Sequence, residues 1–312
     1  VVGVYAQNEW KNTHWSVLLG ARLEKHNLLP KPVCTPRATF RYTPVNGLVL
    51  RAGYSSGYRA PQAYDEDLHV AAVGGNVSLI TLDPNLKPEY SHSATLSIDW
   101  YRQFDALEVN LTAEGFYTYL QDVFFLREDG KDAAGNVLFT RTNARGAWVG
   151  GLNLEGKLNY QKRDFNFQLS MGYTYQQSRY IEPLQWSADV PAQKRMLHTP
   201  DNYAYLLFDI QPVHDFTISI NGKATGSMLV PHLAGFIAQD EQTETPTFWE
   251  LGNSLAYDIH LYKHYCLEIR GGVQNILDQY HRDIDKGEFR DANYIYGPTM
   301  PRTYFLGLAL KL

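Results

Sequence analysis

The sequence predicts an all-β protein, specifically a transmembrane antiparallel β-barrel. Apolar and polar residues alternate over about thirteen segments, and this period of two is the geometry of β-strands. Short turns and long loops join these segments in strict alternation, as in outer-membrane barrels with one plain and one elaborated rim. Trp and Tyr gather near the ends of the segments, as in the aromatic girdles at the two membrane interfaces.

Composition narrows the class of protein further. The 312 residues include 22 tyrosines, and aromatic residues make up 13% of the chain. No run of about 18 apolar residues occurs, so the sequence holds no candidate transmembrane helix. The net charge of −5 argues against nucleic acid as a partner. The two cysteines, Cys34 and Cys266, are too few for a disulfide scaffold, and we expect them to lie unbonded near opposite rims.

The last segment, residues 301–312, shows the alternation most clearly. The residues on every second position include Tyr304, Leu306, Leu308 and Leu310. An edge strand this apolar would invite aggregation in a soluble protein. In a closed barrel the last strand pairs with the first and its apolar face meets lipid. An edge strand of a soluble sandwich would show the same pattern on this segment alone.

Twelve similar segments precede the last one. The strongest hairpin signal is the pair Asn46-Gly47, which links two of them through a tight turn. In chain order, the predicted strands are residues 2–10, 15–23, 37–43, 48–55, 94–100, 107–113, 152–160, 165–176, 203–211, 216–223, 249–259, 267–273 and 301–312.

Long connections separate the predicted hairpins. Connections of this length in a compact domain are usually functional or disordered. The segments that we interpret as loops without strands are residues 57–88, 128–136, 180–200, 227–246 and 278–300.

The two faces of the predicted strands differ in charge. Outward, toward lipid, we expect Leu96, Ile98, Leu154, Leu169, Ile218, Ile269, Leu308 and Leu310. Inward, toward a lumen, we expect Arg51, Glu108, Glu155, Lys157, Glu268 and Arg270. These charges require partners in a dry core but tolerate a wet or plugged lumen. We expect too few partners for them on this chain, so that a plug or water satisfies them.

The predicted number of strands indicates whether this chain can form a closed barrel by itself. A closed bacterial antiparallel barrel needs an even number of strands, and about thirteen are predicted. If the last strand ends on the side of the short turns, the first must start on the side of the loops. We therefore expect this chain to be the back part of a larger barrel, with its first and last strands as open edges or paired with segments outside this numbering.

Five stretches carry a family resemblance. They are GVYAQNEW at residues 3–10, LRAGYSSGYRAP at 50–61, DPNLKPEYS at 83–91, GVQNILD at 272–278 and PRTYFLGLALKL at 301–312. In these stretches, which follow one another in family order, the sequence resembles the C-terminal part of the barrel of TonB-dependent outer-membrane receptors. The resemblance implies that residues 1–312 are a portion of a 22-stranded barrel whose N-terminal plug domain is absent from this chain.

The resemblance also implies a function. It indicates import of a scarce nutrient across the outer membrane of a Gram-negative bacterium, with energy from TonB delivered through the plug. The ligand would be a chelated metal, such as a siderophore or haem complex, or cobalamin. The expected partners are therefore outer-membrane lipid, the plug domain, TonB and the ligand, and no cofactor is expected. A glycan-importing receptor, a passive porin and a structural outer-membrane barrel are the alternatives.

Signals for an enzyme are weak. No HExxH, CxxC, GxSxG or P-loop pattern occurs, and we expect neither catalysis nor a metal site. Carboxylates near His281 suggest a metal or acid–base cluster, although such a run is more often a solvated loop face. These carboxylates are Asp283, Asp285, Glu288 and Asp291.

Aromatic and charged loop residues are the candidates for ligand contact. Tyrosine offers a flat amphipathic surface at low entropic cost, which suits chelates and sugars. The candidates are Tyr58, Arg59, Tyr64, Tyr180, Trp186, Tyr280, Tyr294 and Tyr296. The competing interpretation is that these tyrosines belong to the upper girdle or fold the loops over themselves. For Arg59 a structural role at the base of its loop is favoured.

Overall fold

The computed structural model describes residues 1–62, 78–133, 137–262 and 265–311. Thirteen strands follow one another in a single sheet, the main sheet, in which every neighbouring pair is antiparallel. These strands are β1 (Val2–Lys11), β2 (Trp15–Lys25), β3 (Val33–Val45), β4 (Leu48–Arg59), β6 (Glu89–Phe104), β7 (Leu107–Gln121), β10 (Gly146–Lys162), β11 (Phe165–Leu184), β13 (Asn202–Val213), β14 (Phe216–Thr225), β17 (Phe248–Tyr262), β18 (Tyr265–Gln274) and β19 (Thr303–Lys311). The predicted fold class and the thirteen predicted strands are confirmed.

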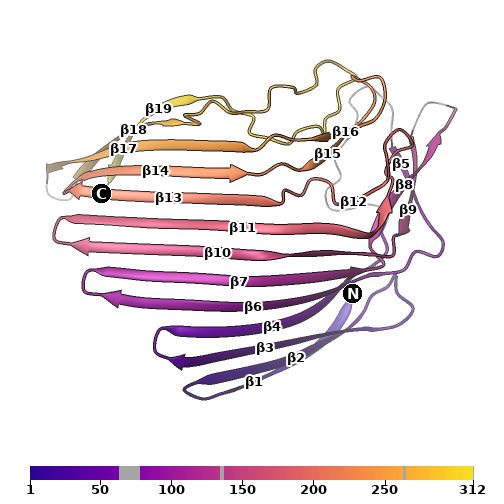
Figure 1. The fold of residues 1–312 in the computed structure, drawn as a ribbon, viewed down its shortest axis with the longest axis horizontal. Helices are drawn as coiled ribbons and strands as arrows, with labels where there is room; N and C mark the ends of the chain where they lie inside the picture. The colour runs from indigo at the N-terminus through magenta and orange to yellow at the C-terminus, as the bar shows by residue number, and fades with distance from the viewer. Residues whose placement is uncertain (63–77, 134–136, 263–264, 312) are drawn as a thin grey trace.

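The connections fall on two rims, as predicted. In Figure 1 the short turns lie at the left, which we call the turn rim, and the long connections lie at the right, which we call the loop rim. At the Asn46-Gly47 turn, Gly47 has φ of 83°, and a Cβ there would lie 2.2 Å from the carbonyl oxygen of Tyr101. Only glycine fits this turn without displacing the neighbouring strand.

The loop rim holds more structure than the sequence predicted. A three-stranded sheet there consists of β5 (Ser78–Leu82), β9 (Val137–Asn143) and β8 (Phe124–Lys131). A second sheet pairs β15 (Leu229–His232) with β16 (Glu241–Glu244), and β12 (Gln193–Arg195) pairs with the extended end of β11. The interpretation of residues 57–88, 128–136, 180–200 and 227–246 as strandless was therefore wrong. These strands are three to eight residues long, mostly too short for alternation to stand out.

The register divides the main sheet into an apolar face and a polar face. Cross-strand partners share a face, and Leu154 lies opposite Ala113 and Tyr173, while Glu155 lies opposite Thr112 and Gly172. Continued through the pairs, this register puts Leu96, Ile98, Leu154, Leu169, Ile218, Ile269, Leu308 and Leu310 on the apolar face. The charged residues Arg51, Glu108, Glu155, Lys157, Glu268 and Arg270 share the polar face.

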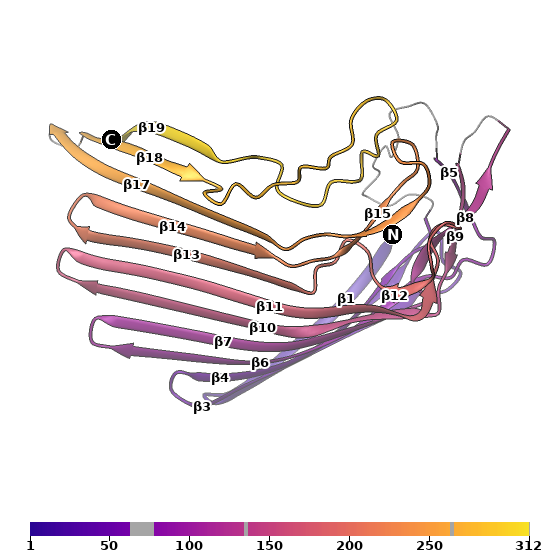
Figure 2. The ribbon, with the colours of Figure 1, turned by 45° about the horizontal axis from the view of Figure 1, so that its top comes forward.

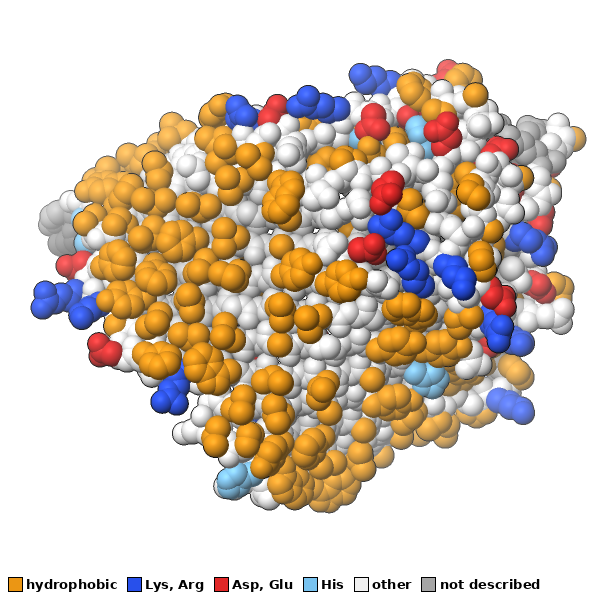
Figure 3. Space-filling view, viewed as in Figure 1, with side chains coloured by type: hydrophobic (Ala, Val, Ile, Leu, Met, Phe, Trp, Pro, Cys, Tyr) orange, Lys and Arg blue, Asp and Glu red, His pale blue; other side chains and the backbone are white. Residues whose placement is uncertain are grey.

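The apolar face of the main sheet is open rather than packed. Leu96 is 64% exposed and Leu308 is 70% exposed. Hydrophobic side chains spread widely over the face seen in Figure 3. An exposed apolar area of this extent marks a surface that interacts with a membrane or another protein.

The main sheet is curved but not closed. Figure 2 shows the curvature, with β1 and β19 at separate edges. Within the described residues β1 pairs only with β2, and β19 only with β18. The expectation that the first and last strands do not pair with each other is confirmed. In the same described residues, no helix is long and apolar enough to cross a bilayer.

The two cysteines are free, as predicted. Cys34 lies near the start of β3, on the loop rim, and Cys266 near the start of β18, on the turn rim. A bridge needs Cα atoms about 6 Å apart, which the length of the intervening strands does not allow.

Candidate functional site

Two connections of the loop rim meet in a group of mostly buried aromatic and charged side chains, which we call the loop cluster. One connection holds β15 and β16, and the other joins β18 to β19. The members of the loop cluster are His232, His281, Asp283, Asp285, Asp291, Tyr294 and Tyr296.

At the centre of the loop cluster, His232 and Asp285 form a buried pair. Nε2 of His232 lies 2.9 Å from Oδ2 of Asp285, and the side chains are 8% and 1% exposed. Tyr294 stacks on His232 with the ring centroids 3.7 Å apart and the planes at 8°. The same Asp285 oxygen accepts the backbone N–H of Asp291 at 3.0 Å. This pair therefore joins residues 53 positions apart in the chain.

The ring of His281 lies near this pair, and the backbone N–H of His281 donates to the carbonyl oxygen of Pro298 at 2.7 Å. The ring centroid of His281 is 3.8 Å from that of Tyr296. Nε2 approaches Oδ1 of Asp283 to 3.0 Å but is not aligned for a hydrogen bond, and both ring nitrogens lack one within the described residues. Burial lowers the pKa of His281 from its ordinary value, which favours the neutral ring at neutral pH.

Asp283 is the polar anchor of the two tyrosines. It accepts hydrogen bonds from the hydroxyl groups of Tyr296 at 2.7 Å and Tyr294 at 3.2 Å. Burial acts to raise the pKa of Asp283, but the hydrogen bond from Tyr296, a backbone hydrogen bond and the nearby His281 outweigh it, so the pKa is lowered. Burial, followed by the bond to Asp283, raises the pKa of Tyr296. Both tyrosines therefore stay neutral donors.

The run of carboxylates near His281 is not uniformly a solvated loop face. Asp285 and Asp291 are 3% and 6% exposed. Asp291 accepts the backbone N–H groups of Leu233 and Asn293, both at 2.9 Å, whereas Glu288 is exposed. The solvated-face interpretation was wrong for the two buried aspartates, because a buried carboxylate that accepts backbone donors holds a loop in shape.

The predicted ligand-contact residues do not form one site. Tyr294 and Tyr296 come together, with ring centroids 5.2 Å apart, but Tyr294 is only 3% exposed. Tyr280 lies in the same connection and packs under Arg282 at 4.7 Å. Tyr64 lies outside the described residues.

The remaining candidates sit on other connections. Tyr180 is near the end of β11, opposite Ala147, and Tyr58 is near the end of β4, opposite Tyr90. The indole N–H of Trp186 is buried without a hydrogen-bond partner among the described residues. Whether these side chains contact a ligand stays a prediction.

Arg59 anchors the base of its loop. Its guanidinium lies 5.3 Å from the ring centroid of Phe124, and its cross-strand partner is Glu89. Glu89 in turn accepts the backbone N–H of Phe124 at 2.9 Å. These contacts tie the end of β4 to the start of β8, which supports the structural role for Arg59 over ligand contact.

Half of the charged residues predicted for the lumen have partners on this chain. Arg51 pairs with Asp99 at 2.5 Å, Arg270 with Glu268 at 3.1 Å. Lys311 bridges Glu268 and Asp258, both at 2.9 Å. The expectation of too few partners was wrong for these residues. Arg270 and Glu268 are two positions apart on the same strand, whereas Arg51 and Asp99 lie on neighbouring strands. For Glu108, Glu155 and Lys157, the described part of the chain provides no ion pair.

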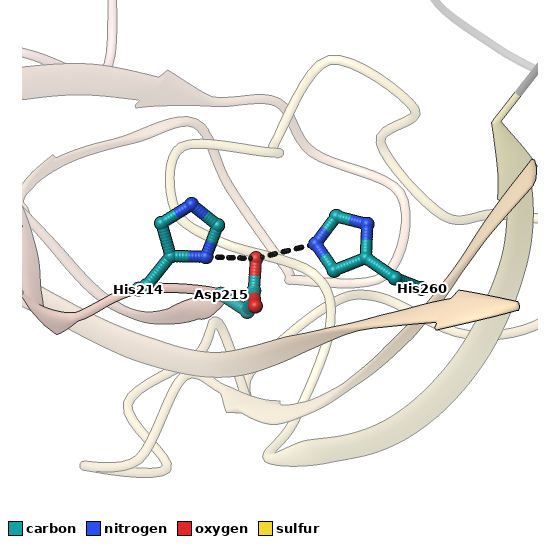
Figure 4. A group of neighbouring side chains, drawn as sticks. All are labelled: His214, Asp215 and His260. Carbon is teal, nitrogen blue, oxygen red and sulfur yellow. Dashed lines mark hydrogen bonds and ion pairs between the residues drawn. The ribbon is translucent and has the colours of Figure 1, made fainter. Parts of the chain in front are cut away.

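A separate group of polar side chains, at the turn rim, was not predicted from the sequence. It consists of His214, Asp215 and His260, which we call the turn site (Figure 4). The Nδ1 atom of His214 lies 2.6 Å and Nε2 of His260 2.8 Å from the same oxygen, Oδ1 of Asp215. The hydrogen bond to Asp215 raises the pKa of His214, and the bonds from both rings lower the pKa of Asp215.

The sequence places only two of the three residues of the turn site next to each other. His214 and Asp215 are adjacent in a predicted turn, but His260 lies 45 positions beyond Asp215. Only the pairing of β14 with β17 brings it near.

Solved structures show the same fold as this chain. The siderophore receptor PirA from Acinetobacter baumannii matches with a TM-score of 0.65 and 17% identity over 98% of this chain and 45% of its own. The ferric-catecholate import receptor Fiu from K12 E. coli matches with a TM-score of 0.65 and 16% identity over 99% of this chain and 44% of its own. For the outer membrane transporter YddB from Escherichia coli the TM-score is 0.66, with 14% identity over 99% of this chain and 45% of its own.

The matches to solved structures cover only part of those proteins. The chain spans less than half of the length of these solved proteins, and comparison with curated protein sequences gives no match. The family model described as TonB dependent receptor-like, beta-barrel matches residues 1–276, which is most of the chain. With the antiparallel sheet, its two rims and its two faces, this match shows that the chain belongs to the TonB-dependent receptor β-barrel family.

Proposed function

We propose that this chain forms the C-terminal portion of the barrel of an outer-membrane importer for a ferric chelate of the siderophore class. The observation that carries the proposal is the family match over residues 1–276, joined by structural matches to siderophore receptors over nearly the whole chain. A further matched structure is that of a mutant of the ferric enterobactin receptor from Pseudomonas aeruginosa in complex with enterobactin. The siderophore and ferric-catecholate receptors among the matched structures favour iron chelates over haem and cobalamin.

The two faces of the main sheet suit an outer-membrane barrel. Charged side chains at the centre of a bilayer are costly, and a lipid-facing surface must be apolar. The face that holds Leu96 and Leu308 meets this requirement, while the opposite face holds Arg51 and Glu155. Localisation in the outer membrane of a Gram-negative bacterium follows from this proposal.

The polar face suits a lumen that is filled by a plug domain. Glu108, Glu155 and Lys157 have no ion pair within the described residues, and Glu155 and Lys157 are exposed. Charges of this kind need water or a partner when they are enclosed. We propose that a plug domain supplies partners for these three residues, and that TonB acts through that plug.

The loop rim suits recognition outside the cell. Its loop cluster holds two long connections together, so that aromatic and charged side chains are presented on a fixed frame. A preorganised frame lowers the entropic cost of binding. The proposed ligand-facing side of this frame consists of the exposed Asp283, the partly exposed Tyr296 and the partly exposed Tyr280 of the same connection.

Uptake measurements in living cells test the proposal. Cells that produce the protein, with and without functional TonB, would be given radiolabelled iron as a ferric catecholate or a ferric hydroxamate. Haem, cobalamin and an oligosaccharide serve as the competing ligands. We expect TonB-dependent accumulation of iron from at least one ferric chelate.

Each other outcome contradicts the proposal in a distinct way. Entry of many small solutes at equal rates with and without TonB would identify a passive porin. TonB-dependent uptake restricted to the oligosaccharide, haem or cobalamin would keep an importer but replace its ligand class. If the protein is present in the outer membrane and transports none of these ligands, the remaining interpretation is a structural barrel.

A further inference from the structure

We propose that the turn site, His214, Asp215 and His260, binds a divalent transition-metal ion of the Zn²⁺ class. The site lies on the turn rim, at the opposite end of the strands from the loop cluster. It is therefore separate from ligand recognition at the loop rim and does not depend on the proposed import function.

The ligand atoms of the turn site already converge. One nitrogen of each imidazole and a carboxylate oxygen lie within 4.8 Å of one another. Both nitrogens point at the same Asp215 oxygen, at 2.6 Å and 2.8 Å, while the second nitrogen of each ring points away from it (Figure 4). A neutral imidazole can carry its proton on that second nitrogen and offer the inner lone pair to a metal.

The backbone holds these three residues in place. The pairing of β14 with β17 begins at Phe216 opposite Tyr257, directly after Asp215. The backbone N–H of Asp258 donates to the carbonyl oxygen of Asp215 at 2.9 Å, two residues before His260. Asp215 itself has φ of 66°, a left-handed turn conformation that aspartate tolerates. The sheet therefore sets the spacing between the carboxylate and His260.

The donor set selects the class of ion. Two imidazoles and one carboxylate suit Zn²⁺ and its neighbours Co²⁺, Ni²⁺ and Cu²⁺, whereas Mg²⁺ and Ca²⁺ prefer oxygen ligands alone. Bonds of about 2.0–2.2 Å in tetrahedral geometry place ligand atoms about 3.3 Å apart. The present nitrogen–oxygen distances are 2.6 and 2.8 Å, so the rings need to move outward by roughly half an ångström.

Exposure of the two rings permits this movement. The side chains of His214 and His260 are 71% and 65% exposed, and that of Asp215 is 22% exposed. On the solvent side, water would complete the coordination of the ion, as in metal sites that have three protein ligands and one open position. A bound ion would clip the turn between β13 and β14 to the end of β17.

Calorimetric titration of Zn²⁺ into the purified, chelator-treated protein in detergent tests the proposal. We expect one tight Zn²⁺ per chain and no competition by Mg²⁺. His260→Gln and Asp215→Asn should each weaken Zn²⁺ binding at least about tenfold, which is the smallest loss typical of altered metal sites. His14→Gln is the matched control, because His14 is an exposed histidine in another short turn and its ring contacts Thr13. This control should bind Zn²⁺ as the unaltered protein does.

Two results would overturn the proposal. The first is the absence of Zn²⁺ binding, or equal affinity in the unaltered protein and His260→Gln. The second concerns the donor atoms, since Cys266 lies opposite His260 in the register. X-ray absorption at the zinc edge should show nitrogen and oxygen ligands, and a sulfur ligand would assign the ion to a different site.

Discussion

In the main sheet Leu308 is 70% exposed, whereas Val230 in the loop rim has no exposed surface. The same contrast holds for charge, because Glu155 on the sheet is exposed while Asp285 in the loop cluster is buried. The sheet is therefore held by its backbone ladder and depends on its surroundings to cover its apolar face. The loop rim is held by buried side chains, as an ordinary soluble domain is. The two regions of this chain therefore differ in packing, with apolar side chains exposed on the main sheet and buried in the loop rim.

The largest expected effect is in the loop rim, from Asp285→Ala. The change leaves the ring of His232 and the backbone N–H of Asp291 without their acceptor in a buried place. We expect a loss of about 3–5 kcal/mol of local stability, measured by hydrogen exchange of residues 227–246 and 278–300. Glu288→Ala, at an exposed position of the same connection, is the control. Unchanged exchange in Asp285→Ala would show that the loop rim does not depend on its buried polar pair.

Next in size is the effect of a charge on the apolar face of the main sheet. Leu154→Arg should lower the free energy of unfolding in lipid vesicles by about 2–4 kcal/mol if residue 154 lies near the bilayer midplane. Glu155→Arg, its neighbour on the polar face, should cost clearly less. Equal costs for the two variants would remove the distinction between a lipid face and a lumen face.

A smaller effect is expected from Tyr296→Phe. The change removes one hydrogen bond to Asp283, of 2.7 Å, and keeps the ring against His281. Because Asp283 is 61% exposed, water replaces part of the bond, and we expect a loss of about 1 kcal/mol in local stability. Tyr280→Phe is the matched control, since Tyr280 contacts Arg282 through its ring face. A loss of equal size in both variants would contradict the role of Asp283 as anchor.

Acid should loosen the loop rim gradually and leave the main sheet unchanged. The pKa of His281 is lowered by burial, so the unfolded connection binds a proton more readily than the folded one. The stability of the folded connection is complete above the unfolded pKa of about 6.5 and falls as the pH drops toward the folded value. Asp283, whose pKa is also lowered, adds a further loss below about pH 4.

Hydrogen exchange at pH 7.5 and 5.5 measures this response. Residues 278–300 should exchange faster at the lower pH after correction for the intrinsic rate, while β6 and β7 should not. The response at pH 5.5 should be reduced in His281→Gln. A response of the same size in that variant would assign the titration to another group.

The contrast between the two regions also explains what the sequence could predict. Strand β2 was predictable because Trp15, Val17 and Leu19 repeat every second residue, and each strand pairs with its neighbour in the chain. In the loop rim, β15 and β16 are four residues each, and no periodicity identifies them. Alternation of apolar and polar residues therefore predicts long strands and the pairing of consecutive strands, but not the short strands of the loop rim.

The candidate sites show the same limit. Tyr294 and Tyr296, two of the predicted ligand contacts, lie with their ring centroids 5.2 Å apart, and they are also close in sequence. The pairing of His232 with Asp285 and that of Asp215 with His260 span 53 and 45 positions. Such contacts depend on which strands and connections lie side by side in the fold, and a single sequence does not display that arrangement.

The small sheet of β5, β9 and β8 has a consequence for the order of folding. β5 pairs in parallel with β9, and Thr81 contacts Thr140 across 59 positions, with the whole hairpin of β6 and β7 between them. Closing a loop of this length costs more entropy than closing a short turn, and such contacts form slowly. The hairpins of the main sheet should therefore assemble first, and the loop rim should acquire its structure late, on a scaffold of strands that have already paired.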